Sequence, residues 1–128
     1  MAYGSVLADT VQGSTSGTPP TFKDGNGTQI GTLCRAWVYF NGSGTVAING
    51  SFNVSSITDN GTGTYTVNFT TAMPDANYSC VASTDPTGGS SNISAGPTVF
   101  STGSVQVATE QANGAAIDRS IVTVSVFR

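Results

Sequence analysis

Seven carboxylates and two cysteines are the first side chains of this chain to consider for acid, base or nucleophilic chemistry. The chain contains no histidine, so a Ser-His-Asp triad, a Cys-His pair and a histidine metal site are all excluded. A glycosidase would need only two carboxylates brought together across strands. However, the carboxylates are scattered, and most stand beside Gly, Asn or Pro, where aspartate commonly stabilises turns. They are Asp9, Asp24, Asp59, Asp75, Asp85, Glu110 and Asp118. We therefore predict that the protein is not an enzyme.

The sequence also lacks motifs that bind cofactors or metals. Residues 13–17 read GSTSG, with threonine where the G-x-S-x-G elbow needs its nucleophile. No phosphate-binding loop with a following lysine occurs. Residues 24–27, DGNG, lack the pattern of a calcium loop and are typical of a hairpin turn. The sequence predicts neither a cofactor nor a metal.

Two turn-rich stretches are the candidates for ligand contact. Residues 58–63 read TDNGTG and residues 85–92 read DPTGGSSN. Binding residues concentrate on loops that a rigid scaffold holds. The candidate contact residues are Asp59, Asn60, Asp85, Ser90 and Asn92. For the second stretch, a plain solvated connection is the alternative.

The composition indicates which elements must position these loops. The chain has 13 Val and 6 Ile against 2 Leu, with 19 Thr and 16 Ser. β-Branched residues favour strands, whereas the usual helix formers Leu, Glu and Lys are scarce here. We predict an all-β protein, a single antiparallel β-sandwich of about eight short strands, jelly-roll-like or lectin-like.

Two regions differ along the chain. Residues 1–20 are rich in Gly, Ser and Pro around a short apolar patch, so they predict an N-terminal arm that is flexible or orders only on assembly. Residues 21–128 alternate between polar and apolar positions and predict the sandwich domain. Residues 51–57, 65–69 and 120–127 are among its expected strands.

Residues 29–40 predict a strand that is covered on both faces. Trp37 and Tyr39 lie on one face of this strand, and Ala36, Val38 and Phe40 lie on the other. Exposed aromatic residues are enriched at protein interfaces. Trp37 and Tyr39 are therefore candidates for a subunit interface, and the alternative is that Trp37 is simply a core residue.

The charges exclude one class of partner. A formal charge of −3, with four cations in 128 residues, cannot make the basic stripe that neutralises phosphates. We expect no nucleic-acid partner. We also expect no signal peptide and no membrane insertion, because the N-terminus lacks a basic and apolar leader and no run approaches ~20 apolar residues.

Three runs carry a resemblance to a known class of protein. They are residues 37–42 (WVYFNG), 51–63 (SFNVSSITDNGTG) and 65–78 (YTVNFTTAMPDANY). Together they resemble segments of tailed-phage virion proteins, especially the tail-fibre-like proteins of marine phages. The flanking residues are similar to those proteins in composition only.

The resemblance implies a location and partners. It implies a β-rich, usually homotrimeric appendage of the virion that binds the host surface, including host surface glycans. The N-terminal arm would then dock onto other virion proteins. Two alternatives are a capsid decoration or head-fibre protein and a lectin-like carbohydrate-binding module that stacks sugars on Tyr or Trp.

The two cysteines leave two possibilities open. Cys34 and Cys80 both fall in predicted strands, so a disulfide is possible if their α-carbons come within ~7 Å. Two buried free thiols are favoured by the phage resemblance, because a phage protein folds in a reducing cytoplasm.

Overall fold

The structure is a computed structural model that describes residues 4, 7–15, 19–85 and 94–128. The described residues form ten β-strands and no helix, and every paired strand is antiparallel. The chain divides into two compact units, Met1–Leu33 and Cys34–Arg128. This division lies later in the chain than the 20/21 boundary expected from the sequence.

The first unit holds a short hairpin. Strand β1 (Phe22–Lys23) pairs with β2 (Gln29–Gly31) across the predicted turn. The Asp24 carboxylate accepts hydrogen bonds from the backbone N–H groups of Asn26 and Thr28, each at 2.9 Å. Asp24 therefore shapes a turn, as its sequence context predicts. No described residue of this unit is buried.

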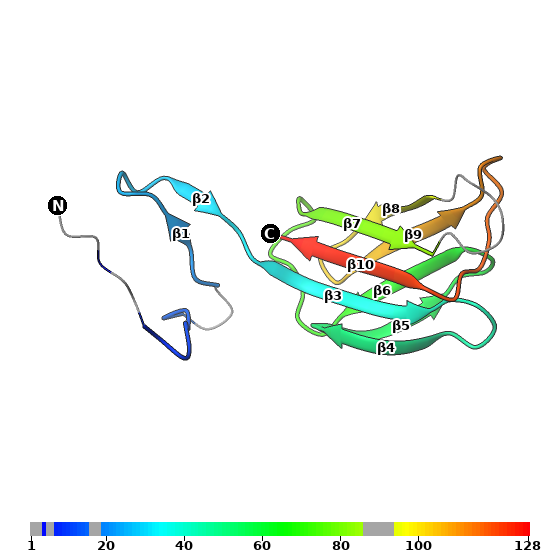
Figure 1. The fold of residues 1–128 in the computed structure, drawn as a ribbon, viewed down its shortest axis with the longest axis horizontal. Coiled ribbons are helices and arrows are strands. Elements are labelled where there is room, and N and C mark those ends of the chain that lie inside the picture. The colour runs from blue at the N-terminus through cyan, green and yellow to red at the C-terminus, as the bar shows by residue number, and fades with distance from the viewer. Residues whose placement is uncertain (1–3, 5–6, 16–18, 86–93) are drawn as a thin grey trace. The chain divides into compact units, whose positions relative to one another are not determined.

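The second unit is a sandwich of two four-stranded sheets that pack face to face (Figure 1). The first sheet has the order β4 (Ala47–Phe52), β3 (Cys34–Asn41), β10 (Val122–Phe127) and β7 (Ser79–Thr84). The second has the order β5 (Val54–Asp59), β6 (Thr64–Phe69), β9 (Ser104–Glu110) and β8 (Ser94–Phe100). The all-β antiparallel sandwich predicted from the sequence is confirmed, whereas the jelly-roll-like and lectin-like descriptions stay predictions.

The core comes from the two middle strands of each sheet. Inward residues alternate along them because successive side chains of a strand point to opposite faces. In the first sheet, the register places Val38 opposite Val124, and both are buried. In the second, Tyr65 lies opposite Val107. Phe40 and Tyr65 join the layers edge to face, with ring centroids 5.2 Å apart.

The long strand expected over residues 29–40 is in fact two strands. Residues 29–31 form β2 of the first unit, and β3 of the sandwich begins at Cys34. One face of β3 is buried, as expected, but Trp37 and Tyr39 on the other face are exposed. Trp37 is therefore not a core residue of this domain.

A second correction concerns residues 51–57, which the alternation predicts as one strand. The chain leaves the first sheet after Phe52 and enters the second at Val54. Asn53 makes this turn with a φ of 55°, the left-handed region that asparagine tolerates better than most residues. The alternation of apolar and polar residues continues through this turn. The sequence pattern therefore does not show where the chain passes from one sheet to the other.

Candidate binding face

The structure gives Asp59 and Asn60 local roles in the turn between β5 and β6. The Asp59 carboxylate accepts a hydrogen bond from the Gly61 N–H at 2.9 Å. The Asn60 side chain donates from Nδ2 to the Thr66 hydroxyl at 2.7 Å. Both residues are exposed, and these bonds shape the turn.

Asp85 is buried, whereas the sequence suggests that it is an exposed loop residue. Only 7% of its surface is exposed, and its carboxylate lies 3.3 Å from the Ser120 hydroxyl and 3.4 Å from the Thr84 hydroxyl. The other two candidates of that loop, Ser90 and Asn92, lie outside the described residues. The structure thus holds Asp85 inside the domain.

A polar cluster around the buried Tyr65 hydroxyl joins three loops of the sandwich. Asp118 accepts hydrogen bonds from the Gly63 N–H at 2.7 Å and from the Tyr65 hydroxyl at 2.9 Å. The same hydroxyl also lies 2.8 Å from the Gly42 carbonyl oxygen. Burial, and then the Asp118 carboxylate, raise the pKa of Tyr65, so the phenol stays neutral. The Tyr65 side chain is fully buried and Asp118 is exposed, so the cluster links the loops from the interior of the domain to its surface.

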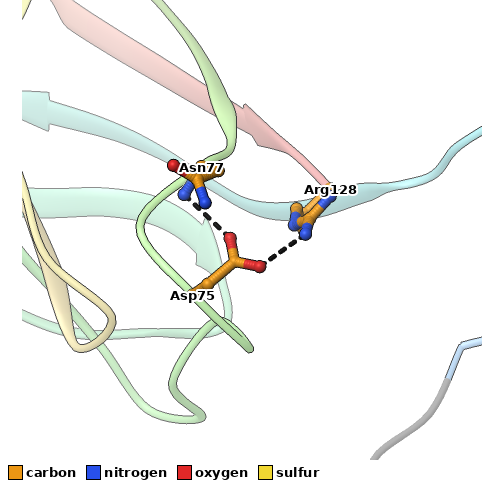
Figure 2. Close-up of polar contacts among 3 residues, drawn as sticks. All are labelled: Asp75, Asn77 and Arg128. Atoms are coloured by element: carbon orange, nitrogen blue, oxygen red, sulfur yellow. Dashed lines mark hydrogen bonds and ion pairs between the residues drawn. The ribbon is translucent and has the colours of Figure 1, made fainter.

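An exposed ion pair ties down the C-terminus. Arg128 pairs with Asp75, and the Asn77 N–H donates to the same carboxylate at 2.8 Å (Figure 2). The hydrogen bond from Arg128 lowers the pKa of Asp75 below its usual value. Exposed pairs of this kind contribute little to stability. No cluster of three potential metal ligands occurs among the residues that the structure describes.

A hollow of about 160 Å³ lies beside strand β8. It is lined by Ser94, Ala95, Gly96, Pro97, Thr98, Ala108 and Glu110. Glu110 is the one charged side chain of this lining, so the hollow lacks the pair of carboxylates that glycoside hydrolysis needs.

The outer face of the first sheet carries a row of exposed apolar side chains. The register aligns Phe52, Trp37, Ser125 and Val81 across the four strands. The neighbouring row consists of Gly50, Tyr39, Thr123 and Ser83. We call these eight residues the aromatic face.

Trp37 lies across the neighbouring strand. A Cβ atom built on Gly50 would stand 3.5 Å from Cζ3 and Cη2 of the indole ring, so the ring lies beside Gly50 at an ordinary contact distance for a methyl group. Gly50 does not adopt a positive φ, and its backbone conformation is therefore open to any residue. Glycine within a strand commonly marks such a close approach.

The outer face of the second sheet has a different character. Asn68 donates from Nδ2 to the hydroxyls of Ser56 and Thr58, at 3.1 and 3.0 Å. The Thr98 hydroxyl donates to the Gln106 side-chain oxygen at 3.0 Å. These side chains bind one another in a polar network, although Val99 and Phe100 of β8 are also exposed on this sheet. Of the two outer faces, the one that exposes aromatic rings is the candidate binding site.

Sequence reasoning found part of this site. It named Trp37 and Tyr39 as candidates for a subunit interface, which stays a prediction, and both are exposed on the aromatic face. It missed Phe52, Gly50 and Val81, since only the register between strands brings them beside Trp37 and Tyr39. The glycine at position 50, inside an expected strand region, was the available signal.

Comparisons with known proteins return no match to a family model, a curated protein or a solved structure. Among the described residues, no helix has the length and apolar character needed to cross a membrane.

Proposed function

We propose that this protein is a non-enzymatic structural or receptor-binding component of a tailed-phage virion, which contacts its target through the aromatic face. The resemblance of residues 37–42, 51–63 and 65–78 to tail-fibre-like proteins supports the virion assignment. The contact surface is supported by the contrast between the two outer faces of the sandwich.

That contrast is the observation on which the proposal depends. Burying an aromatic side chain contributes ~1.5–3 kcal/mol, so leaving three aromatic rings on one sheet face forgoes a large stabilisation. The second sheet shows that this same chain can cover an outer face with hydroxyls and amides. Exposed rings on the first sheet are therefore explained best by a partner that covers them.

The N-terminal unit is the proposed attachment segment. Its hairpin has two strands, and isolated two-stranded hairpins are marginally stable in water. Leu7, Val11 and Ile30 are exposed apolar residues of this unit. We assign to it the contact with other virion proteins and the assembly of a homotrimer. Light scattering that finds a monomer at micromolar concentration would contradict the trimer.

Adsorption tests the receptor-binding role. The full-length protein should compete with phage for host cells, and the double variant Trp37→Ala/Tyr39→Ala should lose this competition. Val99→Ser, which removes an exposed apolar side chain from β8 of the other sheet, is the matched control and should compete normally.

A capsid decoration or head-fibre role predicts another result. In that case, the purified protein labels capsids but neither binds host cells nor competes with phage. Immunogold labelling of particles distinguishes a tail location from a capsid location.

A further inference from the structure

Each sheet of the sandwich has two edge strands, and three of these four strands are irregular. β8 contains Pro97, which has no N–H to donate, and its register shifts just after this residue. Asn49 of β4 and Ser55 of β5 are extra residues that have no partner in the neighbouring strand. Bulges and prolines of this kind prevent an edge strand from pairing with another chain. Three edges of the sandwich are therefore poorly suited to such pairing.

Strand β7 is the regular edge strand (Figure 1). Its six residues read SCVAST, without charge, proline or glycine. Each of them has a partner in β10, and the register does not shift. No described strand pairs with the other side of β7. That side therefore presents a regular row of backbone N–H and C=O groups, which is a template for a further strand.

The sequence of β7 matches an identical strand that runs antiparallel to it. Residues 79–83 have the order serine, small residue, valine, small residue, serine. A two-fold axis at Val81 would place Val81 opposite the partner's Val81 and Ser79 opposite the partner's Ser83. On the inner face, Cys80 would lie opposite the partner's Ala82. Each pair is matched in size and polarity, and none brings like charges together.

The same pairing would cover apolar surface that a single chain leaves open. Val81 is 58% exposed, more than any other large apolar residue of the sandwich unit that the structure describes. Cys80 and Ala82 pack against the core but are only half-buried. An added strand lies ~4.8 Å away, so its side chains would shield all three residues.

From these features we infer that β7 is a self-association edge, at which two copies of the chain pair antiparallel about a two-fold axis at Val81. The symmetry of residues 79–83 favours a second copy over an unrelated strand, because an identical strand matches it residue by residue. The pairing joins the two first sheets into one sheet of eight strands. It also makes the aromatic faces of the two copies continuous, since Val81 ends the row of Phe52, Trp37 and Ser125.

This contact is separate from the proposed function. It uses the sandwich unit, whereas the trimer contact is assigned to the N-terminal unit, and it does not depend on the virion assignment. One edge strand offers less than the ~800 Å² that a stable interface takes from each partner. The dimer should therefore be weak, and its population should rise with protein concentration.

Cysteine trapping in the full-length chain tests the register. Val81→Cys should form a disulfide-linked dimer under mild oxidation, because the two Cβ atoms would lie ~5 Å apart across the axis. Ser79→Cys should not link to itself, since the two copies of this residue would be ~14 Å apart. A mixture of Ser79→Cys with Ser83→Cys should link. Wild type, with its two native cysteines, and Val99→Cys on β8 supply the background.

Opposite charges test whether the same contact forms in solution. Val81→Lys and Val81→Glu each place like charges across the axis, so each variant alone should dissociate at least about tenfold more readily than wild type. An equimolar mixture should form the heterodimer, in which the two charges attract. Sedimentation over a range of micromolar concentrations measures this. Val99→Lys is the matched exposed control and should behave as wild type, and urea denaturation verifies that each variant folds.

Three results would overturn the pairing through β7. The first is Val81→Cys that cross-links no more than Val99→Cys. The second is a mixture of Ser79→Cys with Ser83→Cys that links no more than Ser79→Cys alone, since the axis would then not lie at Val81. The third is a mixture of the lysine and glutamate variants that associates no better than either variant alone. Adsorption to host cells is measured separately, so these results leave the receptor-binding proposal to its own test.

Discussion

Asn53 connects the two sheets through its side chain as well as its backbone. Its Nδ2 donates to the carbonyl oxygens of Arg35 and Thr71, each at 3.0 Å, and its Oδ1 accepts from the Thr71 N–H at 2.7 Å. The residue therefore links β3, the β4–β5 corner and the segment after β6. No other residue type combines two such donors, an acceptor and tolerance of a positive φ at this length.

Replacing Asn53 by alanine should lower the free energy of unfolding by about 2–4 kcal/mol. The change removes three hydrogen bonds at about 1 kcal/mol each and places an alanine at positive φ. Asn53→Gly should cost less, since glycine adopts this φ freely. Urea denaturation measures both, with Asn49→Ala as the control at an exposed asparagine of β4. Equal losses in the alanine and glycine variants would show that backbone conformation is unimportant here.

Tyr65 should make the protein less stable at alkaline pH. Its pKa in the folded state is raised above the ordinary value of 10.0, so the folded state retains a proton that the unfolded chain loses. The stabilisation is complete below pH 10 and is lost as the pH rises further. Tyr65→Phe should lower the free energy of unfolding by about 1–2 kcal/mol at pH 7, because the one hydroxyl proton that the Gly42 and Asp118 oxygens share is lost.

The same variant should flatten the dependence of unfolding free energy on pH above 10. Denaturation series at several alkaline pH values measure this slope for the wild type and Tyr65→Phe. An unchanged slope would mean that Tyr65 does not titrate differently in the two states.

At the scale of elements, the turn between β5 and β6 packs directly against the chain after β9. Gly63 has a φ of 65°, and a Cβ there would stand 2.5 Å from the Thr109 carbonyl oxygen and 2.6 Å from the Ile117 nitrogen. Gly63 thus combines a left-handed backbone with a close approach of two backbone segments. Thr109 reinforces the contact, since its N–H donates to the Gly63 carbonyl at 2.7 Å.

Gly44 offers a matched comparison for Gly63. Its φ is 68°, but a Cβ there would meet nothing within 4 Å. Gly44→Ala should lower the free energy of unfolding by about 1 kcal/mol, which is the penalty for placing an alanine at a positive φ. Gly63→Ala should lower the free energy of unfolding by at least about 3 kcal/mol, because the backbone at Thr109 and Ile117 must also move to make room for the Cβ. Thermal or urea unfolding measures the difference, and similar losses in the two variants would contradict the close packing.

The order of the strands keeps the cysteines apart. β3 and β7 lie on opposite sides of β10, so Cys34 and Cys80 are separated by two strand spacings, or ~9.6 Å. A disulfide needs α-carbons within ~7 Å. Both thiols are free, as the sequence analysis favoured, and burial raises the pKa of Cys80 to about 11.

When the protein is unfolded in denaturant without reductant, both cysteines of each chain should therefore react with iodoacetamide. In the native protein, alkylation of Cys80 should accelerate as the pH rises toward 11, because only the thiolate reacts. Mass spectrometry after iodoacetamide treatment measures both results. If the monomeric chain has no free thiol before reduction, Cys34 and Cys80 form a disulfide with each other, and this result would contradict the strand order.

At the scale of the whole molecule, the sandwich should fold without the N-terminal unit. Every buried apolar residue among the described ones lies between Ala36 and Val126. A fragment of residues 34–128 should keep a cooperative unfolding transition, with an unfolding free energy within about 1 kcal/mol of the full chain. Calorimetry and denaturation measure this, and a fragment that does not fold would show that residues 1–33 complete the core.

The sequence by itself determined the fold class and most of the core. Val122, Val124 and Val126 alternate with polar residues, as do Tyr65, Val67 and Phe69, and both sets are buried. This alternation is local, because the two faces of a strand are defined by neighbouring residues alone. Composition and spacing therefore sufficed for the sandwich and for the buried side of β3, but not for the exposure of its other side.

Only the tertiary structure decided which distant residues meet. The register places Phe52 beside Trp37 and Gly50 beside Tyr39, and the closure of the loops joins Asp118 to Tyr65. It also buries Asp85, which looks like a loop residue in the sequence. These pairings depend on contacts between segments far apart in the chain, which no pattern of adjacent residues encodes.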